Sequence, residues 1–334
     1  MRLEQVDLRT WERALPETGF DVFHTPEALD VLDRHTAGEL RLYAAYKGQA
    51  VVGLFPVFVR ERGPGRMVFS PAPASGADRL GPLVTTDSPK RRKREEANGT
   101  LVERVLDAVD ARSPRTLVWI QCAPSYVDPR PFKWADLDVD ARFTYVLDLA
   151  GATPDDVLSG FNRDLRKDVR EGLDLDVTVA VEGVESAMRI FDDVDARYDE
   201  YGERIPLSRP LYADLVEALG DRCRVYVVRD DDGDYLGGAT ILYSNDAAMF
   251  WQGGVAATHE GTSVNGVLHW AVITDVIEDP ALESVSGYDL VGANDPRLAN
   301  YKAKFGGELV PQYSVESGGV GMAVAKRAYR TLAK

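Results

Sequence analysis

The sequence Tyr288-Asp-Leu-Val-Gly-Ala-Asn-Asp-Pro-Arg-Leu-Ala-Asn-Tyr-Lys-Ala-Lys-Phe-Gly306 carries the strongest structural signal in this chain. It predicts a strand that ends on polar and glycine residues, followed by a short helix and Phe-Gly. A strand-to-helix turn of this kind presents backbone N–H groups and side chains to a cleft. Lys302 and Lys304 stand in it, although the whole chain has only nine lysines. The alternative interpretation is a helix terminus that carries two solvated lysines.

The composition is that of a chain with two ordinary domains. Its 334 residues exceed the usual size of one domain, and the hydrophobic fraction of 45% suffices for ordinary cores. No run of 18 apolar residues occurs, and the N-terminal residues lack the pattern of a signal peptide. We therefore expect a cytoplasmic protein with no membrane partner. Cys122 and Cys223 are far apart and have no histidine at ligand spacing, so neither a zinc site nor a disulfide framework is expected.

The chain is strongly acidic, with a formal net charge of −15 at pH 7. Asp (34 residues) outnumbers Glu (20), and Arg (30) far outnumbers Lys (9). Densely hydrated carboxylates in all segments suit a protein that stays dissolved at high salt, so we expect a salt-adapted source. The same charge argues against a surface that binds nucleic acid as a whole, because phosphate binding needs basic patches.

Two halves of the sequence repeat the same order of predicted elements. Each half has a hairpin with an early glycine in its second strand, Leu40–Tyr46 with Ala50–Arg60 and Arg224–Arg229 with Tyr235–Tyr243. The other predicted strands are Met67–Ser70, Gly81–Val84, Leu117–Cys122, Phe143–Leu149, Leu175–Val181, Ala247–Gln252, Ser286–Val291 and Leu309–Val315. The predicted helices are Pro89–Asp110, Pro154–Glu171, Glu185–Tyr201, Leu211–Leu219, Val264–Ile277 and Arg297–Phe305.

This repetition predicts a duplicated fold of the α/β (α+β) class. Each of its two tandem domains would hold a mixed, mostly antiparallel sheet flanked by helices. The boundary is expected between Ala150 and Thr153, which gives domains at 1–150 and 151–334. Thr153 is expected to cap the helix that begins at Pro154.

Six segments, most of them in the second half, form an ordered set of motifs. They are Phe161-x-x-x-Leu-Arg-Lys-x-Val-Arg170, the glycine-bearing hairpin Val227–Ala239, Trp251-Gln-Gly-Gly254, Asn265-Gly-Val-Leu-His-Trp270, Tyr288-Asp-Leu and Tyr301-Lys-x-x-Phe-Gly306. In this order they resemble the GNAT acyltransferase superfamily, and more closely its Fem-like branch, in which two GNAT domains are fused. The resemblance covers roughly residues 40–315 and is stronger after residue 148. It implies two tandem GNAT-like domains, the second with the active site, and transfer of an acyl or aminoacyl group to an amine.

The resemblance also implies how the substrate is bound. In a GNAT fold the fourth strand parts from its neighbour, so that an extended acyl chain can lie against backbone groups. The fourth strand of the second domain is Ala247–Gln252, which makes Trp251 and Gln252 substrate-binding candidates. Gly253 and Gly254 would allow close approach. The alternative for Trp251 is a core aromatic.

Two residues of the quoted stretch are the catalytic candidates. Lys302 matches the Fem-like pattern as the ammonium that stabilises negative charge on the reacting carbonyl oxygen. Lys304, two positions on, is expected to face solvent. Asp289 would orient the attacking amine or accept its proton, or else it would cap the turn that follows it.

The sequence leaves the acyl donor open between aminoacyl-tRNA and acyl-CoA. Users of acetyl-CoA hold its pyrophosphate on a glycine-rich loop at a helix N-terminus. The segment Ala256–Gly266 lies at that place, but Glu260 has the wrong charge and the glycine spacing differs. The departure agrees with Fem-like enzymes, whose donor is often an aminoacyl-tRNA, and no tightly bound cofactor is expected. Thr262, Ser263 and Asn265 would bind a polar group or cap the helix.

Two groups of basic residues are candidates for phosphate binding. Arg163, Arg166, Lys167 and Arg170 share one helix face by their spacing, and they form either a phosphate site for tRNA or a nucleotide-linked acceptor, or a solvated face. The run Lys90-Arg-Arg-Lys-Arg94 precedes the helix of the first domain, at the place of its anion loop. For this run, phosphate or RNA contact and a plain surface role are both open.

The remaining polar residues complete the functional hypothesis. Tyr198, Tyr201 and Arg204 lie in a segment that suits recognition of the acceptor, and His269 is expected to be packed rather than catalytic. No metal-binding cluster or catalytic triad order is apparent. We therefore predict an amine acyltransferase without a covalent enzyme intermediate, with a small-molecule amine as acceptor. The alternatives are a non-catalytic GNAT scaffold that binds a nucleotide-linked or RNA ligand, and acetyl-CoA use by the first domain. The oligomeric state does not follow from the sequence.

Overall fold

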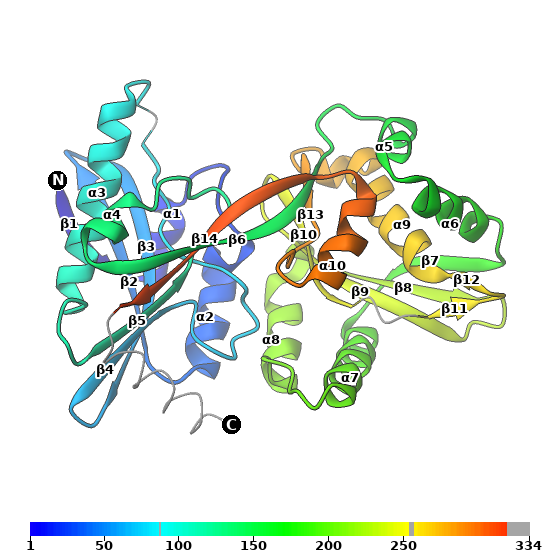
Figure 1. Ribbon diagram of the computed structural model, residues 1–334, viewed down its shortest axis with the longest axis horizontal. Coiled ribbons are helices and arrows are strands. Elements are labelled where there is room, and N and C mark those ends of the chain that lie inside the picture. Colours follow the sequence, from blue (N-terminus) through cyan, green and yellow to red (C-terminus); the bar gives the residue numbers. More distant parts are fainter. Residues whose placement is uncertain (87, 254–256, 319–334) are drawn as a thin grey trace. The chain divides into compact units, whose positions relative to one another are not determined.

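The computed structural model describes residues 1–86, 88–253 and 257–318 and divides the chain into two compact units (Figure 1). The first unit comprises Met1–Arg142 together with the chain from Pro311 on, and the second comprises Phe143–Val310. This division differs from the expected domains at 1–150 and 151–334. The difference arises because the last strand of the chain pairs within the first unit.

The first unit is built on a sheet in the order β1-β2-β3-β4-β5-β14. Its neighbouring strands are antiparallel except β4 and β5, which run parallel and are connected by α3. The elements are β1 (Arg2–Val6), α1 (Leu8–Ala14), η1 (Val22–His24), α2 (Pro26–His35), β2 (Glu39–Lys47), β3 (Ala50–Arg62), β4 (Gly65–Ser70), α3 (Arg91–Ala108), β5 (Thr116–Gln121), α4 (Arg130–Trp134) and β14 (Glu308–Ser317).

The second unit has a sheet in the order β6-β13-β10-β9-β8-β7. Here the one parallel pair among the described strands of this sheet is β13 with β10, and α9 connects them. The elements are β6 (Leu137–Asp148), α5 (Pro154–Gly160), α6 (Arg163–Leu173), β7 (Val177–Glu182), α7 (Val184–Glu200), α8 (Arg209–Leu219), η2 (Gly220–Arg222), β8 (Cys223–Asp230), β9 (Tyr235–Tyr243), β10 (Ala247–Gly253), β11 (Thr258–His259), β12 (Thr262–Ser263), α9 (Val264–Glu278), η3 (Pro280–Leu282), β13 (Gly287–Asp289), α10 (Pro296–Lys302) and η4 (Ala303–Phe305).

The two units are copies of one pattern, as the sequence predicts. In each, an edge strand is followed by two helices, three antiparallel strands, a connecting helix and a strand that runs parallel to the third. The sixth strand of each sheet comes from the other half of the sequence. β14, from the C-terminal part, completes the first sheet beside β5, and β6, from the end of the first half, completes the second beside β13. The predicted α/β class with mixed, mostly antiparallel sheets is confirmed.

Local sequence explains one helix that was predicted wrongly. The expected helix Pro154–Glu171 is broken into α5 and α6. Thr153 caps α5 as expected. A second helix begins because the side-chain oxygen of Asn162 accepts a hydrogen bond from the N–H of Leu165 at 2.8 Å. Gly160, a poor helix former, stands at the break.

Each unit has its own hydrophobic core under its connecting helix. Leu101 and Val105 of α3 are buried against the first sheet, as their helical spacing predicts. In the second unit α6 and α9 cover one face of the sheet, and α7 and α8 cover the other (Figure 1). Val272 and Ile273 of α9 have no exposed surface. No helix in the described part of the chain is both long and apolar enough to cross a bilayer.

Candidate active site in the second unit

The parallel strands β10 and β13 pair over a short length only. Their described pairs are Ala247 with Gly287, Ala248 with Tyr288 and Met249 with Asp289. Beyond this point β10 stays with β9 to its end, past an irregularity after Phe250. The chain after β13 stays with β6 instead, because the N–H of Leu290 donates to the carbonyl of Tyr145 at 2.9 Å. The two strands therefore part after Met249 and Asp289, and we call the line between β10 and β13 the seam.

The matching strands of the first unit, β4 and β5, do not part in this way. They pair over five successive positions. Beyond β4, the segment 80–85 takes the place of that strand between β3 and β5. The N–H of Leu80 donates to the carbonyl of Gln121, and Leu83 exchanges two backbone hydrogen bonds with Leu54, all at 2.8 Å. The first unit thus fills the equivalent of the seam with its own backbone. This speaks against acyl transfer by the first unit.

Lys302 ends α10, and its ammonium is held where the seam opens. Nζ donates hydrogen bonds to the carbonyl oxygens of Val291 and Gly292, the latter at 3.2 Å. Both residues have left-handed backbone angles, φ 53° and 59°, so the chain bends sharply just after β13. The lysine side chain is half-buried, and its charge lies near the second residue beyond the last strand pair. Lys304, expected to face solvent, is also half-buried.

Asp289 is buried at the last pair of the seam. Its Oδ1 accepts hydrogen bonds from the hydroxyl of Thr144 on β6 and from the N–H of Val291, the second at 2.8 Å. The bond to Val291 is that of a residue that caps the turn after β13, which is one of the two predicted roles. Contact of Asp289 with an acceptor amine stays a prediction.

His269 of α9 is packed in the core, as the sequence predicts. Only 3% of the residue is exposed, and its Nδ1 lies 2.8 Å from the hydroxyl of Tyr288 on β13. The rings of Phe250 and Phe305 each lie 4.8 Å from the imidazole, centroid to centroid. Burial lowers the pKa of His269 to about 3, and the charge of Lys302 acts in the same direction. The imidazole is therefore neutral at pH 7, and it anchors Tyr288 instead of acting as a base.

Residues 159–303, which span most of the second unit, match the acetyltransferase (GNAT) domain family. The second unit thus contains a stretch that is similar to GNAT domains. The tandem fold of the chain is similar over nearly the whole length to the crystal structure of FemX, with a TM-score of 0.71 and 11% sequence identity. That match covers 98% of this chain and 99% of the FemX chain. The predicted resemblance to the GNAT superfamily, with Fem-like neighbours in structure, is confirmed.

Two further solved structures share this tandem fold. L-PGS from Bacillus licheniformis has a TM-score of 0.56 and 13% identity, and the match covers 96% of this chain and 95% of that chain. A conserved protein of unknown function from Bacteroides thetaiotaomicron has a TM-score of 0.59 and 8% identity, with 94% and 98% covered. At such identities the likeness establishes the fold alone. A comparison with curated proteins found no match.

Within the GNAT domain, Trp251 is a core aromatic, which is the alternative that the sequence leaves open. It is 7% exposed and stacks on the ring of Tyr212 at 5.0 Å between centroids. The hydroxyl of Tyr212 is hydrogen-bonded to Thr240 on β9, which fixes the stack on one face of the sheet. Gln252, the next residue, is half-buried at the irregularity of β10 and stays a substrate-binding candidate. Gly254 lies outside the described residues.

The N-terminus of α9 differs from the prediction. Ser263 is the N-cap residue, but its side chain makes no capping hydrogen bond, so the capping role expected for it is wrong. Thr262 pairs in the two-residue strand β12. Asn265 is half-buried in the first turn and remains a candidate for substrate binding. Ala256, at the start of the expected anion loop, lies outside the described residues.

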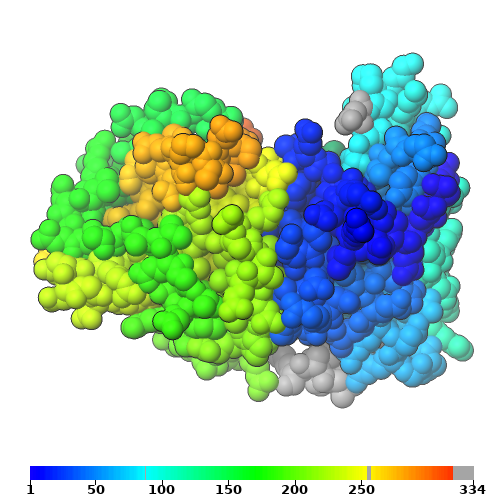
Figure 2. Space-filling view, turned by 180° about the vertical axis from the view of Figure 1, so that it is seen from behind, coloured from blue at the N-terminus to red at the C-terminus, as the bar shows by residue number. Residues whose placement is uncertain are grey.

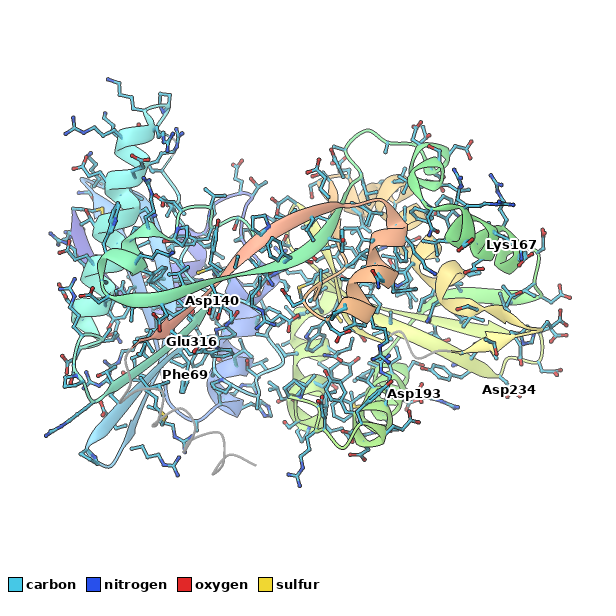
Figure 3. The ribbon with its side chains drawn as sticks, viewed as in Figure 1. Phe69, Asp140, Lys167, Asp193, Asp234 and Glu316 are labelled. Atoms are coloured by element: carbon cyan, nitrogen blue, oxygen red, sulfur yellow. The ribbon has the colours of Figure 1, made fainter. Side chains whose placement is uncertain are left out.

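The predicted basic face exists on α6. Arg163 and Arg170 are exposed, and Lys167, 70% exposed, lies on the outer side of the helix in Figure 3. Lys167 also forms an ion pair of 3.4 Å with Glu171. Arg166 is half-buried and donates to a main-chain carbonyl of α5 at 3.0 Å. Three of the four cations thus face solvent, and contact with phosphate stays a prediction.

The segment expected to recognise the acceptor begins in the last turn of α7 and continues beyond its end. Tyr198 is half-buried in the last turn of α7, and Arg204 is exposed beyond that helix. Tyr201 accepts a hydrogen bond of 2.7 Å from Arg297 of α10, whose guanidinium also lies 5.2 Å from the ring centroid. Sequence reasoning missed Arg297 because its partner lies 96 residues away and no local pattern joins them. Among the described residues, no three His, Cys, Asp or Glu side chains gather as metal ligands.

Proposed function

We propose that the second unit transfers an acyl or aminoacyl group from an activated donor to an amine. The observation that carries this proposal is that β10 and β13 part after three pairs and that the ammonium of Lys302 lies where they part. An extended donor that enters the seam would lie against strand backbone, as peptides do when they add to a sheet. Its carbonyl group would then face Lys302.

The reaction needs a cation and correct positioning. The amine nitrogen attacks the donor carbonyl carbon, a C–N bond forms, and negative charge develops on the carbonyl oxygen. Collapse then breaks the C–O bond of an aminoacyl ester or the C–S bond of a thioester, and the proton that the amine loses ends on the departing oxygen or sulfur, which leaves as an alcohol or a thiol. Lys302 stabilises the oxyanion without giving up its own proton, and Asp289 holds the turn that positions the ammonium.

The favoured donor is an aminoacyl-tRNA, with acyl-CoA as the alternative. Three exposed cations of α6 offer phosphate contacts on a chain whose net charge is −15. The start of this helix contacts the segment that follows Lys302. The ring centroids of Phe305 and Phe161 lie 5.3 Å apart, and the N–H of Asn162 donates to the carbonyl of Lys304 at 2.8 Å. The acceptor is a small-molecule amine, with Tyr198, Arg204, Gln252 and Asn265 as its candidate contacts.

The decisive test replaces Lys302 with methionine, which keeps the length of the side chain and removes its charge. We expect turnover to fall about 10²–10³-fold, the usual cost of losing one oxyanion-stabilising group. Lys304→Met is the matched control, because Lys304 is also half-buried but makes no side-chain hydrogen bond to a described residue. Its turnover should stay within a few-fold of the unmodified protein. A fully active Lys302→Met variant would refute the assigned role.

One observation favours the alternative of a non-catalytic scaffold. The ammonium of Lys302 already donates to two carbonyls, as a lysine that merely fixes a loop would do. A scaffold would be stabilised in thermal-shift measurements by charged tRNA or acyl-CoA and would yield no acylated amine with either donor. An enzyme would yield product, and Lys302→Met would remove it while the melting temperature in the presence of donor still rises.

A further inference from the structure

The first unit contains a cavity of about 1220 Å³ that the proposed acyl transfer does not use. Its lining comes from Val51 of β3 and from four stretches of the chain: residues 14–19 at the end of α1, residues 82–86 before α3, one face of α3, and residues 125–130 before and at the start of α4. Ligand pockets commonly measure about 300–1,000 Å³, so this cavity has room for a nucleotide-sized molecule. All of its lining residues belong to the first unit.

The basic run singled out in the sequence opens onto this cavity. The run Lys90–Arg94 supplies the N-cap and the first turn of α3. Arg91, Arg94, Glu95 and Asn98 share one face of the helix by their spacing, and all four line the cavity. The first turn holds no acidic residue and no side chain caps it, so the positive end of the helix dipole adds to these guanidinium groups. In Figure 2 the cyan surface of α3 stands beside the blue surface of the N-terminal segment.

The lining holds three arginines and three carboxylates, Glu17, Glu95 and Asp128, so its formal charges balance and the arginines differ in how they are paired. Arg130 forms ion pairs of 2.7 Å with both Asp128 and Glu95, and Glu95 also accepts from Arg91 at 2.9 Å. These arginines, Arg130 first, lower the pKa of Glu95, so it is ionised and balances two cations. Arg94 donates to a main-chain carbonyl at 2.7 Å and forms no ion pair with a described carboxylate.

The wall that carries Arg130 is rigid. Asn98 and Tyr126 are each 3% exposed, and the hydroxyl of Tyr126 donates to the side-chain oxygen of Asn98 at 2.9 Å. The amide nitrogen of Asn98 donates in turn to the carbonyl of Asp128 at 2.8 Å. The loop that carries Arg130 is therefore fixed by buried hydrogen bonds, which pre-organises its guanidinium for a ligand.

Part of the lining is apolar, and we call this part the apolar wall. Leu15, Val84 and Val127 line it, and Val127 is 78% exposed in a position where a ligand could cover it. Thr85, also in the lining, has a buried hydroxyl oxygen without a hydrogen-bond partner among the described residues. Buried hydroxyl groups are normally bonded, so Thr85 is a lining residue with hydrogen-bonding capacity that the described residues do not use.

We propose that this cavity binds a phosphorylated small molecule. Its phosphoryl oxygens would bind Arg94 and the neighbouring guanidinium groups, whose planar N–H donors match phosphate geometry. Its organic part would lie against the apolar wall and bond the hydroxyl of Thr85. Because the segment 80–85 fills the row beside β5, the first unit binds this ligand with side chains and transfers nothing. The site is independent of the function proposed for the second unit.

The test is calorimetric titration of the full chain with inorganic pyrophosphate and with ADP. Arg94→Gln should weaken the binding of pyrophosphate at least tenfold. Glu95→Gln should strengthen it several-fold, because it releases Arg91 and Arg130 from a competing carboxylate. Arg104→Gln is the matched control, since Arg104 is exposed on the same helix and does not line the cavity. Opposite effects of two neighbouring substitutions cannot arise from unfolding.

A phosphoryl group could belong to a soluble compound or to a lipid headgroup. Displacement of pyrophosphate by phosphatidylglycerol vesicles, but not by phosphatidylcholine vesicles, would assign the lipid source, and no displacement would assign the soluble one. The proposal is overturned if neither pyrophosphate nor ADP binds, if Arg94→Gln binds as well as the unmodified chain, or if Arg104→Gln causes the same loss. None of these results depends on turnover at Lys302.

Discussion

Gly306 offers a test of how Lys302, the proposed catalytic lysine, is held, because Gly306 ends the turn that follows α10. Its backbone is left-handed, with φ 72°, and an added Cβ would overlap the carbonyl oxygen of Gly160 and lie 3.0 Å from its carbonyl carbon. The left-handed conformation costs a residue with a Cβ about 1–2 kcal/mol. Relief of the overlap with a backbone atom adds about 1–3 kcal/mol of local strain. Gly306→Ala should therefore destabilise the second unit by about 3 kcal/mol.

Gly202 supplies the control, because it has nearly the same backbone angle, φ 69°, and nothing within 4 Å of an added Cβ. Gly202→Ala should lose only the conformational part, about 1 kcal/mol. In a unit of this size 1 kcal/mol shifts the melting temperature by about 2–4 °C, so the two variants should differ by about 4–8 °C. Differential scanning calorimetry measures this difference directly.

The same substitution should reach the active site. The Cβ at position 306 pushes the turn Ala303–Phe305 away from Gly160, and Lys302 immediately precedes that turn. Hydrogen exchange of the α10 amides should become faster in Gly306→Ala and stay unchanged in Gly202→Ala. If the two variants lose equal stability, the close approach of Gly306 to Gly160 is wrong, and the placement of Lys302 that rests on it fails with it.

Two further predictions concern pH and chain length. The pKa of His269 is about 3 in the folded chain and 6.5 in the unfolded chain. Its contribution to the free energy of unfolding is therefore complete above pH 6.5 and is lost as the pH falls toward 3. Between pH 7.5 and pH 5 the free energy of unfolding should fall by about 2 kcal/mol. Urea unfolding at these two pH values should show this loss in the unmodified chain and a smaller one in His269→Gln; equal losses would contradict the assignment. Ending the chain after Val310 should destabilise the first unit, because β14 gives it the fully buried Val315 and the bond from Cys122 N–H to the carbonyl of Tyr313. Hydrogen exchange of β5 should then become faster while that of β9 stays slow, and unchanged protection of β5 would contradict the exchange of sixth strands.

Local patterns in the sequence predicted most of the elements and the duplication. The hairpins carry alternating apolar residues, and Leu101 and Val105 recur at helical spacing, so these elements follow from short-range physics. The position of Lys302 at the end of a short helix was predicted in the same way. The break between α5 and α6 was not, because apolar and charged residues continue across it and only Asn162 marks the new start.

Long-range pairing could not be predicted from the sequence. The sequence predicts that β14 is the last strand of the second domain, and nothing in its residues indicates that it pairs with β5. The same holds for Trp251, whose stacking on Tyr212 depends on how α8 packs against the sheet. The bond between Arg297 and Tyr201 joins two exposed side chains that carry no periodic signal. Such contacts follow from the assembled fold and not from any one segment.

The duplicated pattern explains how one fold can hold two different sites. In the first unit the chain leaves the sheet after Ser70 and returns at Leu80 to resume the same row, which keeps the strands together and builds one wall of the cavity. In the second unit the row of β10 ends at Gly253, and the strands have already parted after Met249. This one difference in connection leaves strand backbone available to the proposed donor in the second unit, whereas the ligand proposed for the first unit would be bound by side chains. Substitutions of side chains in the cavity should accordingly change affinity there without altering turnover at the seam.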